Sequence, residues 1–373
     1  MKLFRRSPVQ TRPLGGLAFP SATSAATAAD HPSATGAAPA ADREYTGTEA
    51  ELHEEIATLR AANQAKADPA IERRLLWLRH LAGIRTLEQV GVEPEPKHPA
   101  PDEAALPAYA GAPPAVSVDQ LTPGLLRAGI LRDGCLLVRG LVGREPALDF
   151  AAEIERAFLE RDRFDAGSLA ADGYYEEFTP HSRFDPYLGR PWIKMGGGVY
   201  AADSPKLSFA MVEMFHAAGL PDLVGGYLGE TPLISVHKST LRKADPSVPG
   251  AWHQDGAFMG PTRSLNLWLS LSRCGDEAPG LDIVPIRLDG YVTTKTEEAT
   301  LDMQVSQTKA EQAAGERGVL RPIFGPGDAL FFDELFLHQT GSDPTMPRPR
   351  YALESWFFGG SKFPSAYAPI AVR

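Results

Sequence analysis

The half of the chain that begins near residue 233 alternates short apolar runs with turns containing glycine and proline. This pattern constrains the fold more than any other feature. The runs expected to form strands are 233–241, 250–258, 264–271, 281–284, 319–324, 329–332 and 351–358. Many short strands separated by such turns are typical of a β sandwich or barrel. Since no glycine-rich phosphate loop precedes a helix, a nucleotide-dependent enzyme is disfavoured.

The region before these strands has mostly helical patterns. Helices are expected at 117–132, 146–161 and 205–228, the last interrupted at Gly219 and Pro221, and a strand is expected at 135–140. Thr122 and Pro123 are residue types that cap and start a helix. The aromatic, aperiodic stretch 167–200 is interpreted as a long ordered loop, either a lid or substrate-binding segment or one whose side chains pack only locally. We therefore expect one domain over residues 117–373, mainly β with flanking helices.

Composition divides the first 116 residues into three segments. Residues 1–44 are rich in Ala, Pro, Ser and Thr, so we expect a disordered tail. Residues 45–92 carry two helical patterns, the second opened by Asp68 and Pro69, and predict a helical hairpin. Seven prolines in 93–116 predict an extended linker. The hairpin is expected to pack on the main domain, to form a homodimer contact, or to do both.

Charge and cysteine content disfavour several classes of protein. With 37 basic and 47 acidic residues, the formal net charge is −10, which disfavours binding to nucleic acid. The sequence has two cysteines, Cys135 and Cys274, which is too few for a disulfide framework or a four-thiolate zinc site. The sequence contains no run of about 18 or more apolar residues, so no membrane span is expected. The basic start is not followed by the apolar segment of a signal peptide, so a cytoplasmic location without membrane partners is expected.

His253 and Asp255 lie two positions apart in an expected strand. Residues at this spacing share one face of a strand, so both side chains can reach one metal ion. The pair alone is weak evidence, because a strand-end histidine and a turn aspartate bonded to local backbone give the same sequence. His338, which lies 83 residues beyond Asp255, supplies a second histidine that a barrel fold can bring close. Two histidines and a carboxylate form the facial triad of non-haem Fe(II) oxygenases.

A facial triad leaves three coordination positions of the metal open. A 2-oxo acid that binds through two atoms can take two of them, and dioxygen the third. The far carboxylate of 2-oxoglutarate then needs a fixed cation. Arginine provides that better than lysine because it binds a carboxylate through two parallel hydrogen bonds. Arg350 lies twelve residues after His338, at the start of the last expected strand, and Arg348 is a competing anchor.

Together these motifs resemble the phytanoyl-CoA dioxygenase family over residues 117–360. The motifs are His253-Gln254-Asp255, Gly327-Asp328, His338-Gln339-Thr340-Gly341 and Arg350-Tyr351-Ala352-Leu353. The resemblance implies a double-stranded β-helix, which is a jelly-roll or cupin-like barrel. It also implies an Fe(II)- and 2-oxoglutarate-dependent oxygenase.

The same resemblance implies a role for individual residues. His253, Asp255 and His338 would be the iron ligands. Arg350 would bind the far carboxylate of 2-oxoglutarate with Thr340 beside it, and Trp268 would lie near the cosubstrate. Because related halogenases replace the metal-binding aspartate with a small residue, Asp255 favours hydroxylation over halogenation.

The predicted reaction oxidises a small molecule with O2 and 2-oxoglutarate and releases succinate and CO2. One alternative is a cupin-type metal enzyme that uses no 2-oxoglutarate and therefore does not need Arg350. Another is a non-catalytic barrel that acts as a binding module, which would not need a complete triad. Substrate choice is expected to depend on the loops at 167–200 and 285–318, because loop chemistry differs among proteins of one fold.

Overall fold

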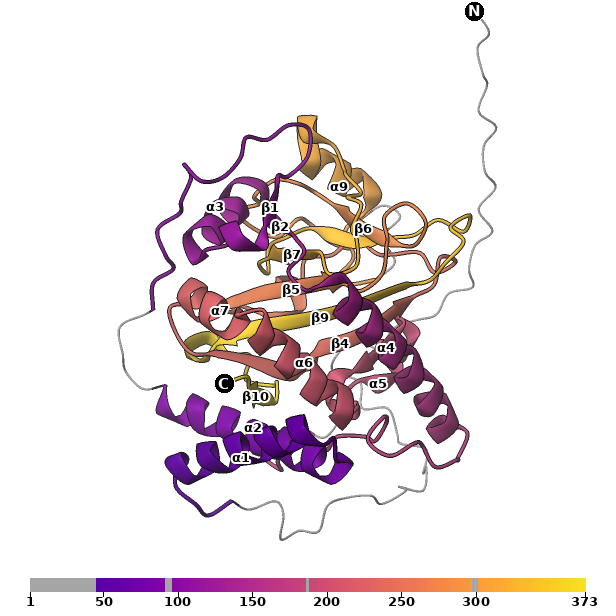
Figure 1. The fold of residues 1–373 in the computed structure, drawn as a ribbon. Coiled ribbons are helices and arrows are strands. Elements are labelled where there is room, and N and C mark those ends of the chain that lie inside the picture. The colour runs from indigo at the N-terminus through magenta and orange to yellow at the C-terminus, as the bar shows by residue number, and fades with distance from the viewer. Residues whose placement is uncertain (1–44, 91–95, 186–187, 297–298, 300) are drawn as a thin grey trace, which may run out of the picture. The chain divides into compact units, whose positions relative to one another are not determined.

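The structure is a computed structural model that describes residues 45–90, 96–185, 188–296, 299 and 301–373 (Figure 1). The tail expected at 1–44 lies outside the described residues. The helices are α1 (Glu49–Ala65), α2 (Pro69–Gln89), α3 (Pro123–Asp133), α4 (Arg144–Asp165), α5 (Arg190–Met195), α6 (Pro205–Ala217), α7 (Leu220–Leu228), α8 (Gly256–Met259) and α9 (Gln307–Ala314). The strands are β1 (Ala115–Ser117), β2 (Cys135–Arg139), β3 (Gly198–Tyr200), β4 (Pro232–Ala244), β5 (Ser264–Ser270), β6 (Gly280–Ile283), β7 (Ala329–Phe332), β8 (His338–Gly341), β9 (Arg350–Gly359) and β10 (Pro369–Ala371).

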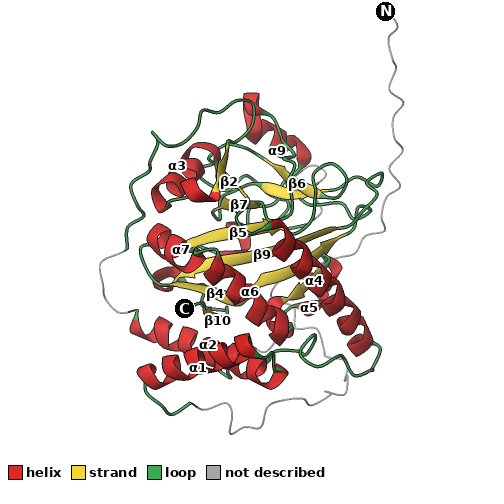
Figure 2. Cartoon of the chain, in the orientation of Figure 1, coloured by secondary structure: helices red, strands yellow, loops and turns green. Residues whose placement is uncertain are grey.

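The strands form a large mixed sheet and a small second sheet (Figure 2). The large sheet has the order β1-β2-β7-β5-β9-β4-β10, and β3 pairs with β4. Only β1 and β2 run parallel; the other pairs are antiparallel. The small sheet consists of β6 and β8, also antiparallel. The described chain is therefore a mixed β structure with flanking helices.

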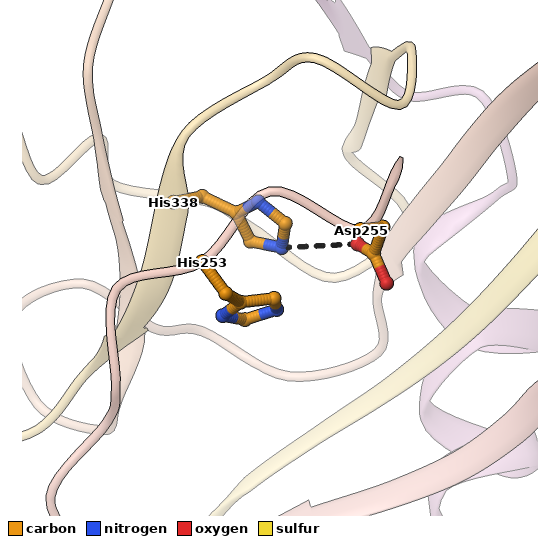
Figure 3. Close-up of side chains that lie close together, drawn as sticks. All are labelled: His253, Asp255 and His338. Carbon is orange, nitrogen blue, oxygen red and sulfur yellow. Dashed lines mark ion pairs between the residues drawn. The ribbon is translucent and has the colours of Figure 1, made fainter. Parts of the chain in front are cut away.

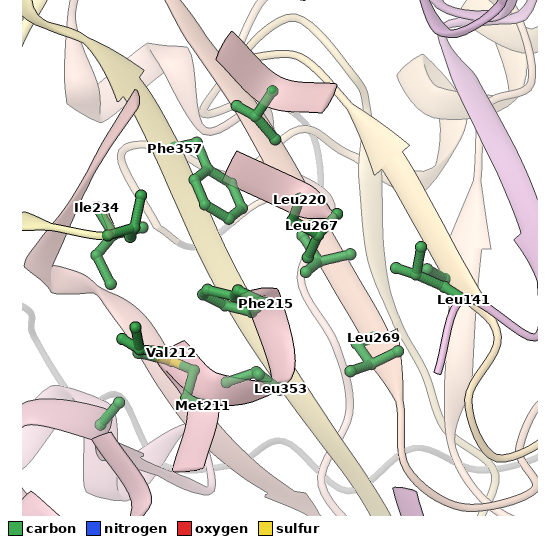
Figure 4. Close-up of a cluster of buried hydrophobic side chains, with 14 of the residues drawn as sticks. Leu141, Met211, Val212, Phe215, Leu220, Ile234, Leu267, Leu269, Leu353 and Phe357 are labelled. Atoms are coloured by element: carbon green, nitrogen blue, oxygen red, sulfur yellow. The ribbon is translucent and has the colours of Figure 1, made fainter. Parts of the chain in front are cut away.

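The large sheet has two faces with different neighbours. One face, here called the helix-covered face, packs its aliphatic side chains on α3, α4, α6 and α7. Figure 4 shows part of this core, where Leu267 and Phe357 from the sheet lie against Phe215 of α6. The opposite face, here called the inner face, packs residues such as Trp268 and Phe332 on Leu281 and Ile283 of β6. The alternation of side chains along each strand produces this division.

Helix starts follow the capping residues in the sequence. The Thr122 hydroxyl accepts from the Leu125 N–H at 3.1 Å, and Gly134 ends α3 in the left-handed conformation with φ 76°. The expectation of a helix from residue 117 is wrong at its start. Residues Ala115–Ser117 pair with β2 as strand β1, and a 3₁₀ turn follows before Thr122. Pro123 can begin an α-helix but lacks the N–H that would continue one from before it.

The first two helices lie where helical patterns were expected. Thr48 and Glu51 form a capping box at the start of α1, and the Asp68 carboxylate caps α2 at the Ala70 N–H. Helix α2 packs on α1, α6 and β10. His80 connects α2 to the rest of the structure because its Nδ1 bonds the Pro369 carbonyl at 2.7 Å and its Nε2 accepts from the His181 N–H at 3.0 Å.

The turn at Gly327 and Asp328 fixes the beginning of β7. Gly327 has φ 92°, and a Cβ there would lie 2.0 Å from the Val142 carbonyl oxygen, so only glycine fits. The Asp328 carboxylate accepts from the Gly140 N–H at 3.0 Å and from Arg139 at 2.6 Å. This turn therefore joins β7 to the end of β2 and has a structural role.

Two expected strands are wrong. Residues 250–255 and 319–324 form only isolated bridges, at Trp252 and His253 and at Leu320 and Phe324, and residues 256–258 belong to α8. The predictions also missed β1, β3, β8 and β10, which have three or four residues each. Such segments are too short to show periodicity, and β8 (His-Gln-Thr-Gly) is polar. Their pairing is decided by partners that are distant in sequence.

The long segments between strands contain more structure than expected. The stretch 167–200 includes α5 and β3, and the stretch 285–318 includes α9. Within the described residues, no single helix is long and apolar enough to cross a membrane. Helices α6 and α7 are long and apolar enough for a membrane span only if they are counted as one segment, and a bend of 74° separates them.

Candidate metal centre

A backbone pair brings His253 and His338 together. The His253 N–H donates to the His338 carbonyl at 3.0 Å, and the His338 N–H donates to the His253 carbonyl at 3.1 Å. The two imidazole rings consequently lie with their centroids 4.5 Å apart. Gly250 permits this close pairing, since a Cβ there would lie 2.1 Å from the Thr340 carbonyl oxygen in β8.

Asp255 reaches the histidines by a different route from the one expected. Its backbone is helical, with φ −61° and ψ −31°, and it precedes the short helix α8. The expectation that His253 and Asp255 share one face of a continuous strand is therefore wrong. The chain turns after His253, and the Gly256 N–H bonds the Glu334 carbonyl at 3.0 Å. This turn, not the pleat of a strand, directs the carboxylate towards the imidazoles.

The three side chains form a cluster that could hold a metal ion (Figure 3). One ligand atom from each of His253, Asp255 and His338 lies within 4.8 Å of the others. Asp255 is 2% exposed and His338 4%, whereas His253 is half-buried. Asp255 Oδ2 lies 3.8 Å from His338 Nε2 and has no hydrogen-bond partner among the described residues. Buried carboxylate oxygens without a partner are costly, and a cation would remove that cost.

Hydrogen bonds orient both imidazoles for metal binding. His253 Nδ1 lies 2.7 Å from the Ala251 carbonyl, and His338 Nδ1 lies 3.1 Å from the Phe336 carbonyl. A carbonyl only accepts, so Nδ1 carries the proton and Nε2 keeps its lone pair. Burial, reinforced by the neighbouring His253, lowers the pKa of His338 to about 4 despite the opposing charge of Asp255. His338 is therefore neutral at pH 7, as a metal ligand must be.

Lys238 on β4 holds the other oxygen of Asp255. Its Nζ donates to Asp255 Oδ1 at 2.8 Å and lies 4.1 Å from the centroid of the Phe258 ring. Burial raises the pKa of Asp255, but the charge of Lys238, and at acid pH those of the protonated imidazoles, outweigh burial and lower it to about 2. The carboxylate is thus ionised, with Oδ1 occupied by Lys238 and Oδ2 free.

The two candidate anchors for a far carboxylate have opposite surroundings. Arg350 is 3% exposed, donates to the Gly280 carbonyl at 3.1 Å, and lies 5.2 Å from the Trp268 ring centroid. Its Nε has no partner, and no ion pair to it occurs in the described part of the chain. Burial lowers its pKa to about 10. Arg348, by contrast, has a side chain 72% exposed and lies 3.5 Å from Glu277. Of these two arginines, Arg350 is the buried one, and it has no anionic partner among the described residues.

The remaining expected residues are Trp268 in the large sheet and Thr340 in the small one. Trp268 is 3% exposed on the inner face and contacts Phe324 with ring centroids 4.9 Å apart. Thr340 is half-buried on β8, opposite Leu281 of β6 and two residues after His338. Positions two apart share a strand face, so Thr340 and His338 have the same orientation relative to the small sheet.

His237 and two acids near His338 in the sequence have partners elsewhere. His237 stacks on Tyr367 with ring centroids 4.8 Å apart, and its Nδ1 accepts from the Ala368 N–H at 3.3 Å. Asp333 pairs with Arg287, and Glu334 accepts from the Ser264 hydroxyl at 3.1 Å. These contacts indicate structural roles.

Sequence reasoning missed Glu354, a half-buried acid on the inner face of β9. Its carboxylate pairs with Arg242 at 2.9 Å. It also left Lys238 among several residues that could line a pocket. Charged residues within otherwise buried strands are the signal that could have found both.

Neither a family model nor a curated protein matches this sequence. Solved structures are similar to parts of it. EctD from S. alaskensis, in a crystal structure with 2-oxoglutarate and 5-hydroxyectoine, has 17% identity and a TM-score of 0.45, and the match covers 73% of this chain and 85% of that one. The non-heme alpha ketoglutarate dependent carbocyclase SnoK from nogalamycin biosynthesis has 12% identity and a TM-score of 0.44, and the match covers 66% and 87%. AviO1 from Streptomyces viridochromogenes Tue57 has 16% identity and a TM-score of 0.39, with coverage of 64% and 96%. The assignment of function rests on this chain's own residues.

Proposed function

We propose that this chain is an Fe(II)- and 2-oxoglutarate-dependent dioxygenase that hydroxylates a small molecule. The observation that carries this proposal is the presence, near the inner face, of two complementary features. One is the cluster of His253, Asp255 and His338, and the other is the buried Arg350 without an anion. A metal cluster alone suits many enzymes, but Arg350 also requires a negatively charged ligand. 2-Oxoglutarate supplies a carboxylate for Arg350 and a 2-oxo acid for the metal.

The donor set fits ferrous iron. Two neutral imidazole nitrogens and one carboxylate oxygen are the ligands of the 2-His-1-carboxylate facial triad. Here Nε2 of each histidine is available because Nδ1 donates to a backbone carbonyl. Asp255 Oδ2 is buried without a hydrogen bond, so it is available as the third donor.

When bound, iron and 2-oxoglutarate would activate dioxygen, so that one oxygen atom enters succinate and the other a C–H bond of the substrate, with loss of CO2. The chain's own residues prepare that chemistry. Lys238 keeps Asp255 ionised and occupies Oδ1, which favours binding of the metal through Oδ2 alone. Arg350 would fix the far carboxylate in a region that Trp268 and Phe324 keep free of water.

We place the chain with the phytanoyl-CoA dioxygenase family on the pattern of its motifs. The Gly327-Asp328 turn, His338-Gln339-Thr340-Gly341 and the strand opened by Arg350 supply that pattern. Within such a family, Asp255 distinguishes a hydroxylase from a halogenase, because a ligating carboxylate occupies the space that a halide would need.

Spectroscopy under anaerobic conditions tests the proposal. Addition of Fe(II) and 2-oxoglutarate to the purified protein should produce a visible metal-to-ligand charge-transfer band. Arg350→Met should weaken 2-oxoglutarate binding about 30-fold or more, because it removes one partner of a buried ion pair. Arg348→Met is the matched control and should leave the affinity unchanged, since Arg348 is exposed.

Other outcomes would favour the rival functions. His253→Ala should abolish iron binding, and stoichiometric iron in that variant would place the metal elsewhere. Full activity of Arg350→Met would indicate a cupin-type enzyme that uses no 2-oxoglutarate. A wild-type protein that binds iron but forms no succinate with any tested substrate would indicate a binding module.

A further inference from the structure

Two buried polar side chains on the inner face have no role in the proposed metal or anion sites. Asn266 on β5 is 0% exposed, and neither its Nδ2 nor its Oδ1 has a hydrogen-bond partner within the described ranges. Trp356 on β9 is also 0% exposed, and its Nε1 is likewise without a partner. Buried polar groups in native proteins are nearly always paired, so such groups indicate that something else binds there.

These two side chains belong to one position in the sheet. Asn266 and Trp356 are direct partners in the antiparallel register of β5 and β9. Side chains that oppose each other in this way lie with Cβ atoms about 4.5–5.5 Å apart on the same face. The amide and the indole do not bond each other. Each of these two neighbouring side chains therefore carries an unused donor, Nδ2 or Nε1, on the same face of the sheet.

The pair lies on the same face as the Arg350 anchor, further along the strands. Trp268 lies two residues after Asn266 along β5, and its ring centroid is 5.2 Å from the Arg350 guanidinium. Two residues along a strand correspond to about 6.6–6.8 Å. A five-carbon dicarboxylate held by Arg350 can extend over such a distance.

Phe332 connects the same position to the metal cluster. It is the direct partner of Asn266 on β7. Its ring lies 4.8 Å from the ring of His338 and 5.8 Å from that of Trp356, centroid to centroid. Asn266 and Trp356 thus lie near the metal ligands, whereas Arg350 begins β9 at the other end of the row.

We infer that Asn266 and Trp356 are binding residues for the metal-proximal end of the 2-oxo acid. This inference rests on the proposed function. The amide Nδ2 and the indole Nε1 donate to the carboxylate or oxo oxygens at that end, while Arg350 binds the opposite carboxylate. The neighbouring apolar residues, including Phe332 and Phe358, exclude competing donors and water. The site therefore selects a 2-oxo dicarboxylic acid of fixed length.

The experiment compares substitutions that keep the size of each side chain. Asn266→Leu removes both amide atoms, and Trp356→Phe removes the indole N–H. Asn63→Leu is the matched control, because the buried Asn63 amide on α1 is paired with Glu72 and with the Asp68 N–H. The measurements are 2-oxoglutarate affinity from the anaerobic charge-transfer band and the melting temperature of the metal-free protein.

The two asparagines should respond in opposite ways. Asn266→Leu should weaken 2-oxoglutarate binding roughly 10-fold or more, because it removes a hydrogen bond to a charged ligand. The melting temperature of its metal-free form should be unchanged or higher, because an unpaired buried amide has been removed. Asn63→Leu should lower the melting temperature and leave the affinity unchanged. Trp356→Phe should also weaken binding, and it replaces Asn266→Leu as the test if that variant does not fold.

Two results would overturn the inference. If the wild type shows the band and both Asn266→Leu and Trp356→Phe bind 2-oxoglutarate within twofold of it, these residues do not contact the oxo acid. A clear fall in the melting temperature of metal-free Asn266→Leu would mean that the amide serves the fold. If the wild type itself gives no band, the proposed function is wrong, and the inference that rests on it is wrong as well.

Discussion

Strands β5 and β9 present two faces that differ in how their polar atoms are paired. On the helix-covered face, Leu265, Leu267 and Phe357 are apolar. The two hydroxyls of β9 are both paired, because Ser355 bonds Ser239 at 2.9 Å and Tyr351 donates to Glu155 at 2.6 Å. On the inner face, Asn266, Trp356 and Arg350 carry buried polar atoms without partners. One face is therefore optimised for stability. The other leaves polar atoms unpaired among the described residues at a cost in stability, as the proposed ligand site requires.

The largest effect is expected on the helix-covered face. Leu267 is fully buried against the helices, so Leu267→Ala should lower the free energy of unfolding by about 2–5 kcal/mol through lost burial and the resulting cavity. Urea denaturation of the metal-free protein measures this change. Leu159→Ala, at a side chain 54% exposed on α4, should change stability by less than about 0.5 kcal/mol. Equal losses in both variants would contradict the assignment of this face to the core.

A smaller effect on stability is expected from the protonation of His80, a buried histidine whose two ring nitrogens are both hydrogen-bonded. Burial lowers the pKa of His80 to about 4, whereas the unfolded value is 6.5. Between these values the unfolded chain binds a proton that the folded chain does not, so stability falls as the pH decreases from 6.5 towards 4. The contribution of His80 between pH 7 and pH 4.5 should be about 2–3 kcal/mol.

A variant isolates this contribution from those of the other histidines. The amide of His80→Gln can donate to the Pro369 carbonyl and accept from the His181 N–H, but it does not titrate. Urea denaturation at pH 7 and at pH 4.5 should therefore show a smaller loss of stability in the variant than in the wild type. Identical losses would mean that His80 takes up its proton without unfolding.

On the inner face, the substitution of a buried residue should stabilise the metal-free protein instead of destabilising it. Arg350→Met replaces a buried cation without an anion by an apolar side chain of similar length. The metal-free variant should be more stable than the wild type by about 1 kcal/mol or more, because the desolvated charge is removed. Thermal denaturation without 2-oxoglutarate measures this gain. A loss of stability would show that the Gly280 carbonyl alone compensates the guanidinium, and the two faces would then not differ as described.

The smallest effect concerns the paired hydroxyls of the helix-covered face. Ser239→Ala leaves the Ser355 hydroxyl without its partner and should cost about 1 kcal/mol. The double variant Ser239→Ala and Ser355→Ala should regain part of that loss, because no unpaired hydroxyl remains. A double-mutant cycle by urea denaturation measures the coupling. Additive losses would mean that the two hydroxyls do not interact.

The sequence by itself determined most elements and the composition of the site. The capping residue Asp68 predicted where α2 begins, because capping depends on local hydrogen bonds. The apolar runs predicted β5, β7 and β9 because their length and bounding turns are local features. The residue types at positions 253, 255 and 338 pointed to a metal cluster, and the structure brings those side chains together.

Tertiary structure decided what depends on distant partners. Strand β8 has no apolar pattern and exists because β6 pairs with it, and this pairing places His338 beside His253. Arg348 and Arg350 look alike in sequence, but only burial against Trp268 and Gly280 leaves Arg350 as a cation without an anion. The unpaired atoms of Asn266 and Trp356 are likewise invisible in the sequence. Whether a polar group is satisfied depends on which strand lies beside it, and long-range folding determines that.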